Sequence, residues 1–195
     1  AALTVLAACN PDAEPSGSEI IAPAEAQTAE TEAAAPASVS QNVETIHDGM
    51  LVMDTHLDTP AYFHSSDYKF SERQTFEEDG THVDLPRMKE GGLDGGFWVI
   101  FTAQGPLDEA SYHAARTSAV LRQMAIRELA AKYSDDVELA FKADDAERIA
   151  AEGKRIVYQS MENSYPLGTD VSLLETFYAG GLRMVGPVHF RDNQF

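Results

Sequence analysis

The chain has 195 residues, an ordinary apolar content of 44% and a formal charge of −18, with 14 Lys and Arg against 32 Asp and Glu. This length and composition predict one folded domain. Nucleic acids and anionic lipid surfaces bind to clusters of Lys and Arg, which this acidic chain lacks. We therefore expect neither nucleic acid nor an anionic lipid surface as a partner.

Residues 1–9 are an apolar run that ends in Leu6-Ala7-Ala8-Cys9 and contains the only cysteine of the chain. They resemble the end of a bacterial lipoprotein signal peptide, in which cleavage leaves the cysteine as a lipid-carrying N-terminus. The resemblance predicts an exported bacterial protein, periplasmic or at the cell surface, held on the membrane through lipid on Cys9 alone. The end of an ordinary secretory signal, or an apolar helix start, is the alternative.

Residues 10–42 carry six acidic side chains and no Lys or Arg, and they are rich in Ala, Pro, Ser and Thr. Such a segment buries too little apolar surface to offset the entropy cost of ordering it. We therefore expect a disordered acidic tether over 10–42, followed by a folded part over 43–195.

The folded part begins with the apolar run Met50 to Asp54, which predicts a short buried strand closed by Pro60. Side chains in a strand alternate between two faces, so Asp54, His56 and Asp58 are expected to point the same way. An imidazole and a carboxylate at this spacing supply half of a four-coordinate zinc site. A second His-x-Asp triplet, His82 and Asp84, lies in a polar connection and is the weaker candidate.

Further along the chain, apolar runs and helical patterns alternate, and Phe97 and Trp98 are expected in the core. We expect, in order, a polar loop over 65–78, a buried strand over 93–102, an amphipathic helix over 107–133 with a solvated His113, a strand over 137–141, a helix capped by Asp144 with Glu147 as in a capping box, a strand over 155–161, a helix including 173–178 that stops at Gly180-Gly181, and a strand over 182–188.

Alternating strands and helices predict an α/β fold with a parallel sheet, either open or closed as a (β/α)8 barrel. His56, Asp58, Glu162 and His189 all fall at the carboxyl ends of predicted strands. Both architectures place their chemistry at that end of the sheet. The shared position favours a metal site more strongly than any one of the four residues does.

The same residues belong to a series of motifs that resembles the membrane dipeptidase (renal dipeptidase) family of zinc hydrolases. The motifs, in chain order, are Asp54 to Pro60, Val83-Asp84-Leu85-Pro86-Arg87, Gly91-Gly92 through Gly95-Gly96-Phe97-Trp98, Met161-Glu162, and Val188 to Asn193. The resemblance runs from about residue 44 to the last residue.

The resemblance implies a (β/α)8 barrel of the metal-dependent hydrolase type that holds two Zn²⁺ and hydrolyses dipeptides with a hydroxide held between the ions. His56 and Asp58 match the pair that binds one zinc, and Glu162 matches the carboxylate that bridges the two. His189 matches the catalytic histidine that contacts the substrate. Two zinc ions can generate the hydroxide at neutral pH and polarise the peptide carbonyl.

Two departures from the family limit this assignment. The family usually continues the glutamate with Gly-Gly-His, whereas this chain has Asn163-Ser164-Tyr165, which leaves the shape of the substrate pocket open. The second zinc of the family also takes two later histidines, and a complete barrel needs roughly 250 residues. We therefore expect residues 43–195 to be the N-terminal half of a truncated barrel, inactive and poorly folded when made alone.

Two rival functions stay open at this point: a non-catalytic surface lipoprotein that retains the barrel, and a mononuclear amidohydrolase acting on a cyclic amide or lactone. The sequence leaves the preferred dipeptide undecided. It leaves equally open whether the protein forms a homodimer.

Overall fold

The structure is a computed structural model that describes residues 37–195, with side chains described from residue 43 onward. Cys9 and residues 10–36 of the predicted tether lie outside the described residues. The first described helix, α1 (Ala37–Asp48), begins six residues before the predicted domain boundary at 43, so the end of the predicted tether is helical. No helix in the described part of the chain combines the length and the apolar content needed to cross a membrane.

The remaining elements alternate between strands and helices, as the sequence predicts. They are β1 (Met53–Leu57), the 3-10 turn η1 (Thr59–Tyr62), α2 (Phe76–Asp79), α3 (Leu85–Glu90), β2 (Gly95–Phe101), α4 (Glu109–Lys132), β3 (Val137–Leu139), α5 (Asp145–Ala151), β4 (Arg155–Glu162), the 3-10 turn η2 (Tyr165–Leu167), α6 (Leu173–Ala179) and β5 (Leu182–Gly186).

The five strands form one parallel sheet with β2 and β4 at its centre. β1 pairs with β2, and β5 pairs with the last residues of β4. The short β3 pairs with Arg155 to Val157, the first residues of β4. β2 pairs directly with β4, although β3 lies between them in the sequence. The sheet is part of a (β/α)8 barrel and is not closed within residues 37–195, which confirms the predicted fold class.

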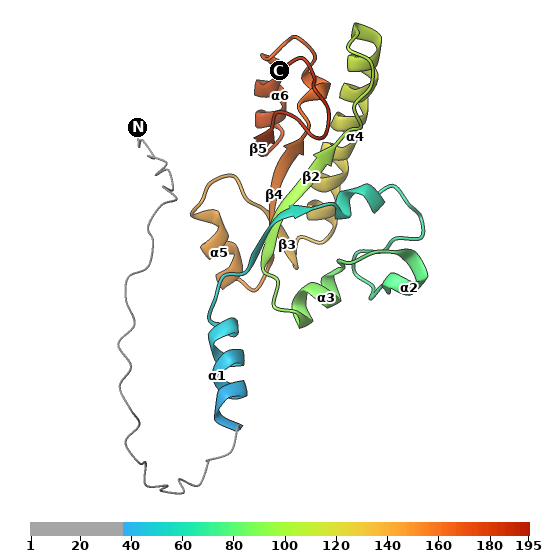
Figure 1. The fold of residues 1–195 in the computed structure, drawn as a ribbon. Helices are drawn as coiled ribbons and strands as arrows, with labels where there is room; N and C mark the ends of the chain where they lie inside the picture. Colours follow the sequence, from blue (N-terminus) through green and yellow to red (C-terminus); the bar gives the residue numbers. More distant parts are fainter. Residues whose placement is uncertain (1–36) are drawn as a thin grey trace, which may run out of the picture. The chain divides into compact units, whose positions relative to one another are not determined.

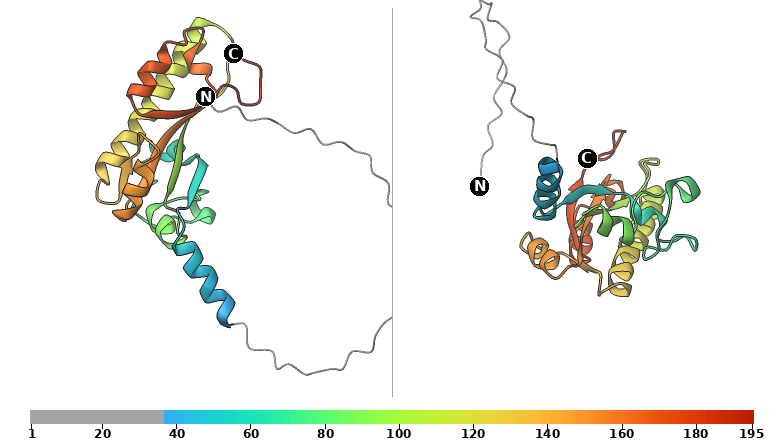
Figure 2. Two further views of the ribbon diagram at one scale, coloured as in Figure 1. Left: turned by 90° about the vertical axis from the view of Figure 1, so that its left-hand side faces the viewer. Right: turned by 90° about the horizontal axis from the view of Figure 1, so that it is seen from below.

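Helix α4 covers one face of this sheet and runs antiparallel to β2 (Figure 1). The main core lies between them and joins Trp98 and Ile100 of β2 to Ile126 of α4, all fully buried. Because α4 runs back along the sheet, its N-terminal end lies at the edge where β2 and β4 end (Figures 1 and 2). This edge is where the candidate residues gather.

The first strand differs from the prediction in its bounds and in its regularity. It runs from Met53 to Leu57 rather than from Met50 to Asp54, and Met50 and Leu51 are exposed. Its pairing with β2 shifts register between Asp54 and Leu57. A bulge of this kind breaks the strict alternation of side chains and re-aims the residues that follow it. The simple alternation argument for Asp54, His56 and Asp58 is therefore wrong, although His56 and Asp58 still meet.

Two smaller predictions are also corrected. Asp144 makes no side-chain cap to α5; instead the Asp145 carboxylate accepts hydrogen bonds from the backbone N–H groups of Phe141 and Lys142, at 2.8 and 3.1 Å. The predicted loop over 65–78 includes the start of α2. Both differences arise because short polar segments take whichever local hydrogen bonds the surrounding fold makes available.

Candidate metal centre

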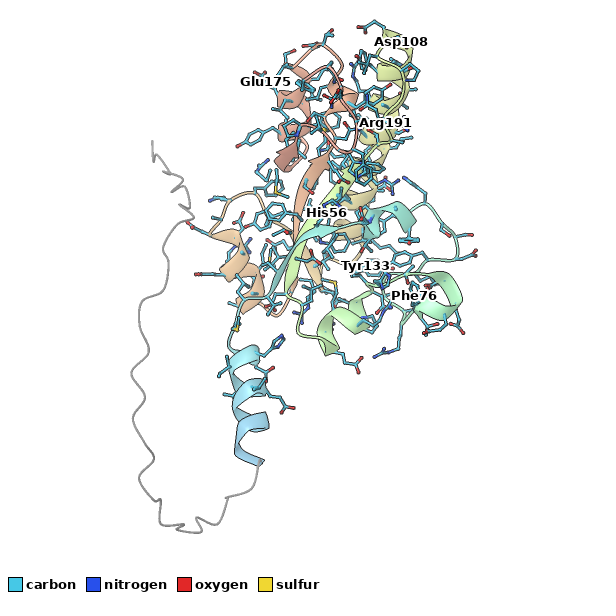
Figure 3. The ribbon with its side chains drawn as sticks, in the orientation of Figure 1. His56, Phe76, Asp108, Tyr133, Glu175 and Arg191 are labelled. Atoms are coloured by element: carbon cyan, nitrogen blue, oxygen red, sulfur yellow. The ribbon has the colours of Figure 1, made fainter. Side chains whose placement is uncertain are left out.

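Three side chains converge at the carboxyl ends of strands β1 and β4. His56 belongs to β1, Asp58 begins the η1 turn directly after β1, and Glu162 is the last residue of β4. One ligand atom from each of the three lies within 4.8 Å of the other two. Figure 3 shows His56 where β1 crosses the central strands. Strands 106 residues apart in the chain thus bring together the residues that the sequence singled out.

The distances between these atoms suit a single metal ion. His56 Nε2 lies 3.4 Å from Asp58 Oδ1 and 3.6 Å from Glu162 Oε2. Two ligands on a tetrahedral zinc with bonds of about 2.0–2.1 Å lie about 3.3–3.5 Å apart. One imidazole nitrogen and two carboxylate oxygens are also donors that zinc accepts. The donor chemistry and the spacing of the group therefore both fit such an ion.

The two carboxylate oxygens of Glu162 have different neighbours. Its Oε2 points to His56, while its Oε1 lies 3.4 Å from Nε2 of His189. The Glu162 side chain is 26% exposed, against 68% for Asp58, so it is the most enclosed of the three candidate ligands. His189 also meets the ring of Phe101, the last residue of β2, at 5.2 Å between centroids. The structure therefore brings His189 to the same centre as the candidate ligands.

The backbone turns sharply after Glu162, at Asn163. This residue has φ = +66° and is the only residue other than glycine with positive φ among those described. Asn tolerates this left-handed conformation better than other side chains apart from glycine. The difference from the Gly-Gly-His pattern is thus explained at this position, because Asn replaces glycine where the turn demands positive φ.

Asn163 is fully buried and ties together the segments around the centre. Its Nδ2 donates to the carbonyl of Thr102 at 3.2 Å, and its Oδ1 accepts from Nδ2 of Asn193 at 3.1 Å. Tyr165, which stands where the family pattern has histidine, is also buried and donates its hydroxyl proton to the carbonyl of Pro106 at 2.6 Å. These bonds fix the loop after β2 and the segment after β5 relative to Glu162.

Arg122 of α4 supports the turn that carries Asp58. Its Nη1 donates to the carbonyl of Pro60, and the η1 turn is closed by the bond from Ala61 N–H to the Asp58 carbonyl at 2.9 Å. Burial lowers the pKa of Arg122, and the nearby Asp58 carboxylate acts in the opposite direction. Sequence reasoning missed this residue. The available signal was an arginine on the buried stripe of the predicted helix, three residues after Ala119 and four before Ile126.

The remaining candidates have structural roles away from the centre. Asp84 is fully buried, caps α3 through the Arg87 N–H at 2.8 Å and pairs with the Arg87 side chain at 2.6 Å, while His82 stacks on Phe76. Asp54 accepts a hydrogen bond from His56 N–H at 2.8 Å and does not join the three-residue group. Of the two His-x-Asp triplets, only the first therefore contributes to a candidate metal site.

Proteins that carry imidazole and carboxylate donors at the strand ends of a parallel barrel include metal-dependent hydrolases. Residues 40–195 match the model of one such family, membrane dipeptidase (peptidase family M19). The chain belongs to this family, which confirms the resemblance found in the sequence.

The curated proteins that resemble the chain include a dipeptidase. The chain is 28% identical to Dipeptidase tcpJ of Claviceps purpurea over 134 residues, which cover 66% of this chain and 32% of that protein. It is also 28% identical to an uncharacterized protein of Acinetobacter calcoaceticus, with 58% of this chain and 40% of that protein covered. The matched region thus spans less than half the length of either curated relative.

Solved structures of a probable dipeptidase and of a metallopeptidase share the fold. The probable dipeptidase PvdM from Pseudomonas aeruginosa superposes with a TM-score of 0.71 at 27% identity, over 83% of this chain and 40% of that one. A metallopeptidase from Rhodobacter sphaeroides, liganded with a phosphinate mimic of the dipeptide L-Ala-D-Ala, gives a TM-score of 0.58 at 25% identity, over 74% of this chain and 47% of that one.

Proposed function

We propose that the full-length protein is a zinc dipeptidase in which His56 and Asp58 bind one Zn²⁺ and Glu162 bridges it to a second. The observation that supports this most directly is the convergence of His56, Asp58 and Glu162 at the strand ends of a membrane dipeptidase family member. Such ions, when bound, supply a nucleophilic water at neutral pH and polarise the peptide carbonyl.

The protein's own groups divide the remaining work. Glu162 has one oxygen toward His56 and the other toward His189, and its negative charge would offset part of the repulsion between two bound cations. His189 stands at the same carboxylate and is exposed enough to reach a substrate, with its side chain 30% exposed. We assign to it the role of donating a hydrogen bond to the peptide carbonyl oxygen as negative charge develops there.

The test uses the full-length protein with a dipeptide such as L-Ala-D-Ala, whose mimic binds the Rhodobacter sphaeroides relative. Glu162→Gln removes a carboxylate ligand, so it should lower the zinc content, read by elemental analysis. Turnover should fall by about a hundredfold or more, because even the partners of metal ligands contribute roughly 10- to 100-fold. Glu147→Gln, on an exposed site of α5, removes the same charge and should change neither.

Each rival function corresponds to a different outcome of that test. One zinc per chain, with turnover of a cyclic amide or lactone but of no dipeptide, would support the mononuclear amidohydrolase. Zinc-loaded protein that hydrolyses none of these substrates would contradict the dipeptidase and support a non-catalytic lipoprotein.

We also propose that Cys9 carries the lipid anchor of an exported bacterial protein. The support is the Leu6-Ala7-Ala8-Cys9 motif, followed by an acidic segment over 10–42. Expressed in bacteria with its complete leader, the protein should fractionate with membranes and incorporate labelled fatty acid. Cys9→Ala should release it to the soluble fraction, and unchanged membrane retention of that variant would contradict the proposal.

A further inference from the structure

A groove of about 530 Å³ lies between the loop that follows β2 and the N-terminal half of α4. Small residues such as Gly105, Ala114 and Ser118 line much of it, so it has room for a side chain. Arg122 is the one charged residue among those that line it. In a chain with a formal charge of −18, such a groove offers an anionic group a rare local cation.

The groove adjoins the candidate metal centre through two of its lining residues. Phe101 contacts His189 at 5.2 Å between ring centroids, and His189 lies 3.4 Å from Glu162. Arg122 holds the carbonyl of Pro60 in the turn that starts at Asp58. A dipeptide at the metal centre could therefore extend one side chain into the groove.

Two donors in the groove have hydrogen-bonding capacity that the described residues leave unused. The Thr102 side chain is buried, at 6% exposure for the residue, and its Oγ1 has no hydrogen-bond partner among them. Nη1 of Arg122 donates to the carbonyl of Pro60, but a guanidinium carries five N–H groups in a planar fork. A carboxylate matches both, because it is an acceptor only and can take paired bonds from arginine.

We propose that this groove binds the side-chain carboxylate of an acidic dipeptide, with Arg122 as its cationic partner and the Thr102 hydroxyl as a second donor. The proposal rests on the dipeptidase function proposed above and adds a substrate class to it. Arg122 thereby acts as a specificity-determining residue as well as a support for the turn at Asp58.

The experiment compares Ala-Glu with Ala-Gln on the full-length protein. The two substrates have the same size and the same C-terminal carboxylate, so their ratio isolates the charge of the side chain. The wild type should favour Ala-Glu in kcat/KM by at least about tenfold, and Arg122→Met should remove most of that preference. Arg127→Met is the matched control, because Arg127 also lies on α4 and donates to a backbone carbonyl, that of Gly180 at 2.7 Å, but does not line the groove.

A purely supporting role for Arg122 gives a different result, since loss of the Pro60 contact would slow both substrates equally and leave their ratio unchanged. That outcome, or a wild type that treats the two substrates alike, would overturn the proposal. Calorimetric binding of the two dipeptides to metal-free protein tests the groove without turnover. One outcome separates the two proposals. If Arg122→Met abolishes a binding preference for Ala-Glu, while the zinc-loaded wild type hydrolyses neither dipeptide, the groove is upheld and the dipeptidase function is refuted.

Discussion

Asn163 is the residue whose backbone most constrains the candidate centre, because it reverses the chain directly after Glu162 with φ = +66°. Its side chain also satisfies the buried carbonyl of Thr102. The residue therefore contributes both a backbone conformation that most side chains disfavour and a hydrogen bond that water cannot replace.

We predict that Asn163→Ala destabilises the full-length protein more than Asn163→Gly does. Both variants lose the bond to Thr102, but alanine must also adopt the left-handed conformation, at a cost of about 1–2 kcal/mol that glycine avoids. Urea denaturation measures the two free energies of unfolding. Equal values would show that the positive φ is not a constraint in solution.

At the scale of the element, the long helix α4 is preceded by its N-cap residue Asp108, labelled at the upper end of the helix in Figure 3. The Asp108 carboxylate accepts a hydrogen bond from Ser111 N–H at 2.8 Å, as an N-cap does. This bond lowers the pKa of Asp108 from its ordinary value of 3.8. The sequence places this helix correctly because its apolar spacing and its capping residue agree.

Asp108→Ala should lower the melting temperature of the protein in a pH-dependent way. Because the pKa of Asp108 is lower in the folded state, its carboxylate contributes stability above the unfolded value of about 3.8, and this contribution is lost as the pH falls through the folded pKa. The melting difference between Asp108→Ala and wild type should be present at pH 7 and shrink below pH 4. A difference that stays constant with pH would contradict this account.

The contact of β1 with β2 depends on Gly96. A methyl group added at Gly96 would lie 2.3 Å from the carbonyl oxygen of Asp54, two residues before His56. Such a distance forces the strand backbones apart, at a cost of about 1–3 kcal/mol.

We therefore predict that Gly96→Ala lowers both stability and zinc affinity, because it displaces the strand that carries His56. Gly49→Ala is the control, since its added methyl would meet its nearest neighbour at an ordinary 3.4 Å. Chelator competition measures the affinity. A Gly96→Ala variant that unfolds more easily yet binds zinc as tightly would separate the strand contact from the site.

At the scale of the whole molecule, the candidate ligands join two strands that do not pair with each other. β2 lies between β1 and β4, and within residues 37–195 β1 pairs only with β2. An ion held by His56 and Glu162 would therefore link β1 to β4 across the intervening β2. This link exists only in the folded state.

Zinc should consequently raise the melting temperature of the full-length protein. Free zinc at a hundred times its Kd stabilises a folded state by about 2.7 kcal/mol if it binds only that state. His56→Ala should abolish most of the shift, while His113→Ala, which removes an exposed histidine of α4, should preserve it. An equal shift in both variants would place the stabilising ion elsewhere.

The sequence predicted the order of elements and the four residues that meet at the candidate centre, His56, Asp58, Glu162 and His189, because those features depend on local patterns. Apolar runs and helical spacing determine which segments become strands or helices, and polar residues at strand ends show where they terminate. The bulge in β1 and the pairing of β3 beside β4 could not be read in this way, since they depend on which strands become neighbours.

Amino-acid order alone thus specified an α/β chain of the membrane dipeptidase family with His56, Asp58 and Glu162 as candidate ligands. Three-dimensional packing was needed to bring Arg122 against the turn at Pro60, to place Asn163 between three segments, and to open a groove beside His189. The physical reason is that these contacts join residues from 30 to 88 positions apart, as Asn163 and Asn193 are at one extreme and Phe101 and His189 at the other. Their partners are selected by the geometry of the assembled sheet and helices, which no local spacing encodes.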